Sequence, residues 1–130
     1  PQFPFGFGLS YTTFKYGKPT LSAQTMDKNG KITLSVAVTN TGRMAGKETV
    51  ELFIGDDKCS EERPKKELKN FAKVALVPGE TKTVSFDITS SDLEYWSERT
   101  HGFVAESGTF TAYVCASETD VRATAKFELK

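Results

Sequence analysis

The residue types that most often carry chemistry in proteins are sparse in this sequence. It has one histidine, His101, and two cysteines, Cys59 and Cys115. So few ligands cannot build a tetrahedral zinc site from cysteine and histidine alone. A cysteine nucleophile with His101 as its base stays open, but no neighbouring motif supports it. We therefore expect no metal and no cofactor, and we interpret His101, which stands beside Gly102, as a solvated turn residue.

The carboxylates are the next candidates for catalysis. The 17 acidic residues are scattered along the chain and balance 17 lysines and arginines, so the formal net charge is zero. A neutral chain without a basic block is not typical of nucleic-acid binding or of attraction to anionic lipid. No apolar run approaches the roughly 20 residues of a membrane-spanning helix. We therefore expect no nucleic-acid partner and no membrane partner.

Aromatic side chains are the third kind of candidate, because they stack on sugars and pack against protein partners. Phe53 and Tyr113 each occupy a position at which the alternation of their segment places a polar, outward-facing residue. Two hypotheses stay open for them: an exposed patch that contacts a partner, or isolated surface aromatics without a role. Trp96 follows Leu93 at helical spacing, and we interpret it as a plug at one end of the core, with a sugar-stacking platform as the alternative.

The elements that must position these residues are strands. Apolar and polar residues alternate with a period of two in five segments, which predicts strands with one buried face; these segments cover residues 32–39, 49–54, 83–88, 109–115 and 121–129. Residues 19–26 and 66–77 are less regular and add two more strands. The parity break between Leu68 and Phe71 indicates a bulge. About seven strands at this spacing predict an all-β fold, an antiparallel two-sheet sandwich of immunoglobulin type.

Turn residues separate the strands. Residues 27–30 (DKNG) are a hairpin signal, and Gly42 and Gly79 are expected to supply positive φ in turns. Residues 90–96 are the exception to the strand pattern, and a helical turn capped by Ser90 or Ser91 fits there.

The two cysteines are not expected to form a disulfide. Cys59 follows one strand and Cys115 ends another, and in such a sandwich these strands are antiparallel neighbours. Their ends then lie about 23 Å apart, whereas a disulfide needs Cα atoms within about 7 Å. We predict two free thiols.

Several motifs, in order along the chain, resemble the C-terminal domain of family 3 glycoside hydrolases, the β-glucosidase and β-xylosidase family. They are residues 4–14 (PFGFGLSYTTF), 38–46 (VTNTGRMAG), 63–71 (RPKKELKNF) and 76–81 (LVPGET). The resemblance implies a fibronectin type III-like sandwich over residues 11–130. It also implies that residues 1–10 are the remnant of a connector from a preceding domain.

The resemblance also implies what this chain lacks. In that family the nucleophile is an aspartate of an N-terminal barrel domain, and the acid/base usually lies in the domain that follows; neither motif has a match here. The expected function is therefore a non-catalytic accessory domain of a retaining β-glucosidase-like parent, secreted or periplasmic. An independent carbohydrate-binding or protein-interaction module is the alternative, although we expect weak sugar binding or none because the aromatics free to stack are few.

The expected partners are the catalytic domains of the parent enzyme. The expected contact residues alternate with small residues near the N-terminus or lie on the polar strand faces: Phe3, Phe5, Phe7, Phe53 and Tyr113. Three phenylalanines left in water forgo roughly 1.5–3 kcal/mol each. The separate chain is therefore expected to be monomeric or to self-associate weakly through its N-terminus.

Overall fold

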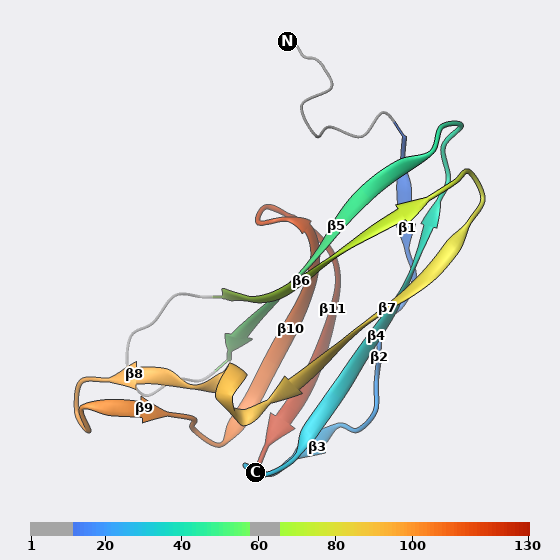
Figure 1. The fold of residues 1–130 in the computed structure, drawn as a ribbon. Coiled ribbons are helices and arrows are strands. Elements are labelled where there is room, and N and C mark those ends of the chain that lie inside the picture. The colour runs from blue at the N-terminus through green and yellow to red at the C-terminus, as the bar shows by residue number, and fades with distance from the viewer. Residues whose placement is uncertain (1–11, 58–65) are drawn as a thin grey trace.

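Two stacked sheets form the body of the molecule in the computed structural model, which describes residues 12–57 and 66–130 (Figure 1). The smaller sheet is built around β4 (Lys31–Asn40). On one side β4 pairs with β1 (Phe14–Tyr16) and β2 (Thr20–Leu21), and on the other with β7 (Thr81–Thr89), always antiparallel.

The larger sheet has five strands in the order β3-β11-β10-β5-β6. These are β3 (Thr25–Met26), β11 (Asp120–Leu129), β10 (Gly108–Ser117), β5 (Gly46–Asp56) and β6 (Glu67–Leu76). All neighbours are antiparallel except β3 and β11, which are parallel.

A short hairpin extends from one end of the sandwich (Figure 1). After β7 the chain makes a single 3-10 turn, η1 (Ser90–Leu93), and then pairs β8 (Tyr95–Ser97) with β9 (Gly102–Val104). His101 lies in the connecting turn with φ 52°, which confirms the turn position expected for it.

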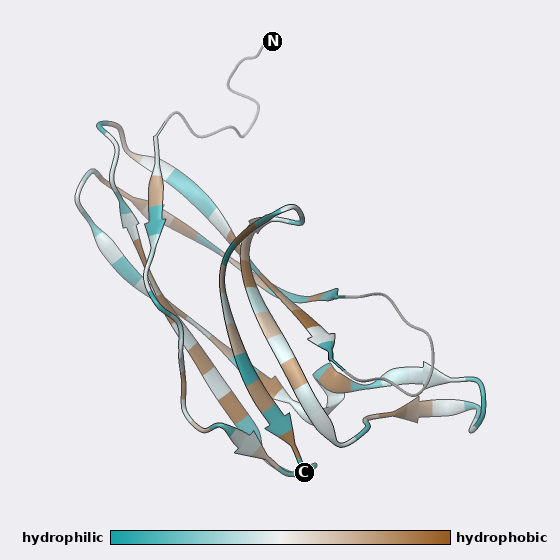
Figure 2. Ribbon diagram, turned by 180° about the vertical axis from the view of Figure 1, so that it is seen from behind, coloured by the Kyte–Doolittle hydropathy of each residue, from teal (hydrophilic) through white to brown (hydrophobic). Residues whose placement is uncertain are grey.

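The core lies between the two sheets and takes one residue in two from each long strand. Figure 2 shows this alternation as bands of brown and teal along the strands. Phe110 of β10 and Phe127 of β11 stack with their ring centroids 5.8 Å apart, and both are buried. Burying such side chains stabilises the fold by roughly 1.5–3 kcal/mol each, which makes this alternation the main determinant of the architecture.

The all-β sandwich expected from the sequence is confirmed, and several local expectations need correction. Residues 19–26 do not form one strand, because β2 joins the smaller sheet and β3 joins the larger. The turn at residues 27–30 is present, with Gly30 N–H donating to the Asp27 carbonyl at 3.1 Å, but it connects strands of different sheets rather than a hairpin. Gly42 has no positive φ, unlike Gly79 at 82°; a Cβ at position 42 would overlap Thr12.

The register of the larger sheet shifts at three places, one between β5 and β6 and two between β10 and β11. In β6, Leu52 and Phe53 face Asn70 and Leu68, so Lys69 is the extra residue, and the predicted bulge is confirmed. Between Val114 and Cys115 of β10, the facing strand β11 has the extra residue Arg122, so Val121 lies opposite Cys115. The alternation predicts that the side chain of Val121 is buried. It is 43% exposed instead, because the bulge reverses its direction.

Trp96 does not plug the core. The helical turn is shorter than expected and ends at Leu93, so Trp96 belongs to the extended strand β8 and shares no helical face with Leu93. Leu93 is fully buried, whereas Trp96 is 49% exposed. The cap also differs from the expected Ser90 or Ser91: the Thr89 N–H donates to the Asp92 carboxylate at 2.9 Å.

Candidate interaction surface

The outer faces of the two sheets differ in chemistry. The face of the smaller sheet carries hydroxyls that bond across the strands: Ser35 Oγ lies 2.9 Å from Ser85 Oγ, and Thr39 Oγ1 lies 2.6 Å from Thr81 Oγ1. Such a face of short polar side chains is typical of a sheet that faces water.

The outer face of the larger sheet mixes polar side chains, such as Glu51 and Lys126, with a group of large apolar ones. Its centre is a row of three paired residues, Tyr113 of β10, Phe53 of β5 and Leu68 of β6. Phe71 and Val121 flank this row, and we call these five residues the outer patch. Leu68, Phe71 and Val121 are 49%, 56% and 43% exposed. Several large apolar side chains on one exposed face are a feature of surfaces that contact a partner.

Lys66 lies over the centre of the outer patch. Its ammonium group is 4.3 Å from the centroid of the Phe53 ring and 5.8 Å from that of Tyr113, and it also donates a hydrogen bond to the Glu118 carbonyl. Phe53 is consequently only 7% exposed, although it lies on the outer face as its parity predicts. The cation–π contact places a positive charge over two aromatic rings of the outer patch.

Cys115 lies beside the outer patch, opposite Glu51 of β5. Its thiol is free and fully buried, which confirms the expected free thiol at this position. Burial raises the pKa of the Cys115 thiol above its ordinary value, and the charge of Lys66 only partly opposes this shift. A thiol with these properties is a poor nucleophile. Cys59 lies outside the described residues.

The structure brings together two of the five expected contact residues. Phe53 and Tyr113 are direct neighbours across β5 and β10. Phe3, Phe5 and Phe7 lie outside the described residues. The sequence did not single out Leu68, Phe71 and Val121 as contact residues, because the bulges in β6 and β11 decide where those side chains point.

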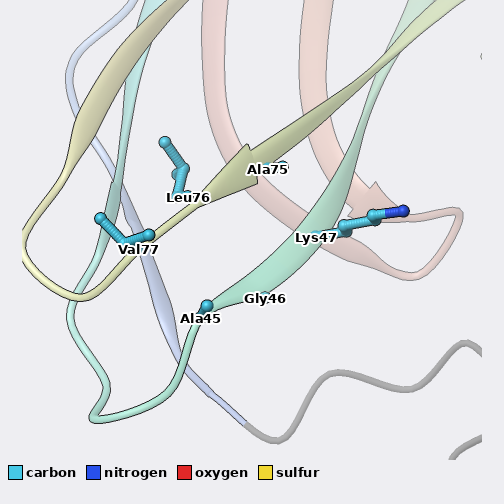
Figure 3. A pocket seen from close by; sticks show the side chains of 6 residues that line it. All are labelled: Ala45, Gly46, Lys47, Ala75, Leu76 and Val77. Carbon is cyan, nitrogen blue, oxygen red and sulfur yellow. The ribbon is translucent and has the colours of Figure 1, made fainter.

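Three pockets in the described part of the chain hold at most one acidic residue each. One, of about 390 Å³, lies where β5 begins and β6 ends, and Figure 3 shows its mainly apolar lining of Ala45, Gly46, Lys47, Ala75, Leu76 and Val77. The Lys47 side chain points away from Leu76 and Val77 (Figure 3). Within residues 12–57 and 66–130, no three His, Cys, Asp or Glu side chains gather as metal ligands. No helix in that part of the chain is long and apolar enough to cross a membrane.

One charged network lies at the edge of the core. Tyr16 donates a hydrogen bond of 3.0 Å to Glu48 Oε2, and the Arg122 guanidinium lies 5.2 Å from the centroid of the Tyr16 ring. Arg122 also donates to Asp120 at 2.9 Å. Burial, aided by the Glu48 charge, raises the pKa of Tyr16, and burial likewise raises the pKa of Glu48 despite the opposing Tyr16 and Arg122. This network joins strands of both sheets and is structural.

Comparison with known proteins matches most of the chain to one part of larger enzymes. A β-glucosidase of Bacteroides ovatus is 53% identical over 128 residues, which are 98% of this chain but 17% of that protein. The periplasmic β-glucosidase of Salmonella typhimurium is 46% identical over 114 residues, 88% of this chain and 15% of that protein. The chain therefore spans about a sixth of the length of these curated relatives.

Solved structures agree with this assignment. The β-glucosidase of Kluyveromyces marxianus superposes with a TM-score of 0.86 at 38% identity, covering 98% of this chain and 16% of that one. The GH3 β-glucosidase of Bifidobacterium adolescentis gives 0.85 at 36% identity, covering 98% and 18%. The family described as fibronectin type III-like domain matches residues 48–118, just over half of the sequence. The chain thus belongs to the fibronectin type III-like domain family, in the form that occurs as one part of β-glucosidases.

Proposed function

We propose that this chain is a non-catalytic accessory domain of a family 3 glycoside hydrolase with β-glucosidase activity, and that it packs against the catalytic domains of that enzyme. The relatives support this proposal, because each aligns with nearly the whole chain over a small fraction of its own length. Retaining hydrolysis needs two carboxylates about 5–5.5 Å apart beside a sugar pocket. The catalytic carboxylates are therefore assigned to the rest of the enzyme.

The observation that carries the proposal is the contrast between the two outer sheet faces. A domain with water on both sides would gain nothing from half-exposed Leu68 and Phe71 beside Tyr113. Against another domain, each such side chain contributes burial worth up to roughly 1.5–3 kcal/mol. The outer patch is therefore the proposed docking face, and the hydroxyl-covered face of the smaller sheet is its solvent side.

The N-terminal residues complete the proposed interface. Residues 1–10 are proposed to be the connector from the preceding domain, with residues 11–130 forming the accessory domain. Phe3, Phe5 and Phe7 would then contact the catalytic domains together with the outer patch. In the separated chain these rings lose their partner, which is why weak self-association through the N-terminus is part of the proposal.

The test compares one substitution in two contexts. Phe71→Lys is made in the 130-residue chain and in the full-length enzyme that contains it. Because Phe71 is 56% exposed, the separate chain should change in unfolding free energy by no more than about 0.5 kcal/mol. The full-length enzyme should lose thermal stability and lifetime at elevated temperature, because a lysine ammonium would be buried at the interface.

The matched control is Ser85→Lys, on the outer face of the smaller sheet. It should leave both the separate chain and the full-length enzyme unchanged. Equal loss of lifetime for the two variants, or none for either, would contradict docking through the outer patch.

A further inference from the structure

The hairpin of β8 and β9 carries a second exposed aromatic feature, which docking through the outer patch does not use. Trp96 and Phe103 face each other across the two strands. Their ring centroids are 5.3 Å apart and the rings are inclined by 77°, so they meet edge to face. Trp96 is 49% and Phe103 68% exposed. The pair therefore forms an apolar corner whose outer surfaces are open to solvent.

A pocket of about 290 Å³ adjoins this corner on the Phe103 side. Three parts of the fold converge on it: Lys28 from the turn between β3 and β4, Ser90 and Glu94 from the ends of η1, and Phe103 from β9. Val104 and Ala105 complete the lining. The pocket thus joins an aromatic ring with a carboxylate, an ammonium and a hydroxyl at a loop-bearing end of the sandwich, where β-sandwich proteins commonly bind ligands.

We propose that this pocket binds a neutral saccharide of one or two pyranose units. A pyranose has an apolar face of C–H groups, which packs on an aromatic ring, and a rim of hydroxyls that both donate and accept hydrogen bonds. Phe103 supplies the ring, Glu94 accepts from hydroxyls, Lys28 donates to them, and Ser90 does either. The assignment rests on this lining and stands or falls separately from docking through the outer patch.

The charges and the size of the pocket select this ligand class. One carboxylate and one ammonium balance each other, which disfavours a charged ligand and suits a neutral one with many hydroxyls. A volume near 290 Å³ lies at the lower end of small-molecule pockets, about 300–1,000 Å³, and matches a small saccharide. The expectation of weak sugar binding or none rested on the small number of aromatics free to stack and on a buried Trp96, and the exposure of Trp96 removes the second reason. A shallow, solvent-open site implies a dissociation constant on the order of millimolar.

The experiment uses Trp96 as a built-in reporter, because it is the only tryptophan of the chain. The 130-residue protein is titrated with D-glucose and with cellobiose, and tryptophan fluorescence and amide NMR shifts are followed. We expect a saturable change in both signals, with the NMR shifts centred on residues 90–94 and 103–105. D-Sorbitol at the same concentrations controls for viscosity and osmotic effects and should give no saturable response.

Two variants test the assigned residues, and a third is their control. Phe103→Ala and Glu94→Gln should each weaken binding about tenfold or more. Phe71→Ala, which removes an equally exposed ring from the outer patch, should leave binding unchanged. Glu94→Gln leaves both hairpin aromatics in place, so a loss of saccharide binding in this variant cannot come from misfolding of the hairpin. Absence of saturation, an equal response to sorbitol, or unchanged binding by both site variants would overturn the proposal.

Discussion

The side-chain amide of Asn40 donates a hydrogen bond of 3.0 Å to the carbonyl oxygen of Leu76, 36 residues further along the chain. Asn40 ends β4 of the smaller sheet, and Leu76 ends β6 of the larger, so this bond ties the two sheets together at one end. The same amide group donates to the Met44 carbonyl at 2.8 Å. Its oxygen accepts from Thr12 at 2.8 Å and from the Gly42 N–H at 2.9 Å. Every hydrogen-bonding position of a fully buried side chain is thereby used.

Asn40→Ala should therefore destabilise the protein strongly. It leaves the Leu76 carbonyl and its other partners without the amide, and each buried unsatisfied group costs roughly 1–3 kcal/mol. We expect a total loss of about 2–4 kcal/mol in the free energy of unfolding by urea. Asn40→Asp should be no milder, because a carboxylate cannot donate to the two carbonyls. A loss below about 1 kcal/mol would show that the tie contributes little.

Core and outer-patch phenylalanines should respond differently to the same truncation. Phe110 is fully buried and stacks on Phe127, so Phe110→Ala should cost about 3–5 kcal/mol. Phe71→Ala should cost no more than about 0.5 kcal/mol in the separate chain. Urea unfolding of the two variants checks this. A comparable loss for both would mean that Phe71 is a core residue of the separate domain.

Glu48→Gln should reveal how burial of this carboxyl affects stability. Because burial raises the pKa of Glu48 above its ordinary 4.5, the folded protein holds the proton more tightly than the unfolded chain. The stability from Glu48 is therefore complete below pH 4.5 and declines as pH rises through the raised pKa. Relative to wild type, the variant should gain in unfolding free energy between pH 4 and pH 7. The measurement is urea unfolding across that range. A difference in unfolding free energy between the variant and wild type that does not change with pH would contradict this prediction.

Asp87→Asn provides a control of opposite sign. The hydrogen bond from Thr33 and the charge of Lys31 lower the pKa of Asp87 below its ordinary 3.8. Its stabilising contribution is present above pH 3.8 and is lost as pH falls through the lowered value. This variant should approach wild type as the solution becomes more acidic, in contrast to Glu48→Gln.

The 130-residue chain should show no glycosidase activity of its own. Retaining hydrolysis needs a pair of carboxylates, and the three pockets found in residues 12–57 and 66–130 hold at most one acidic residue each. Nitrophenyl β-glucoside and β-xyloside are suitable substrates, and the rate should equal that of buffer. Turnover that persists through repeated purification and is abolished by a single carboxylate substitution would contradict the accessory role.

The sequence by itself determined the long strands and therefore the architecture. In residues 32–38 and 84–88, strict alternation leaves one burial pattern that satisfies every apolar side chain, so β4 and β7 follow directly. The free thiol at Cys115 and the turn at His101 were also predictable, the first from strand direction and the second from its glycine neighbour.

Where the alternation of buried and exposed residues is interrupted, the tertiary structure decided which side chains lie on the surface. The extra residues, Lys69 in β6 and Arg122 in β11, break the alternation of side chains, and this fixed the exposure of Leu68, Phe71 and Val121. Trp96 became exposed because the chain leaves η1 as a strand, a choice made by pairing with β9 rather than by local spacing. Phe53 is covered by Lys66, thirteen positions away, and the pocket beside Phe103 gathers residues from three separate elements. Contacts between distant segments create these features, and local periodicity carries no information about them.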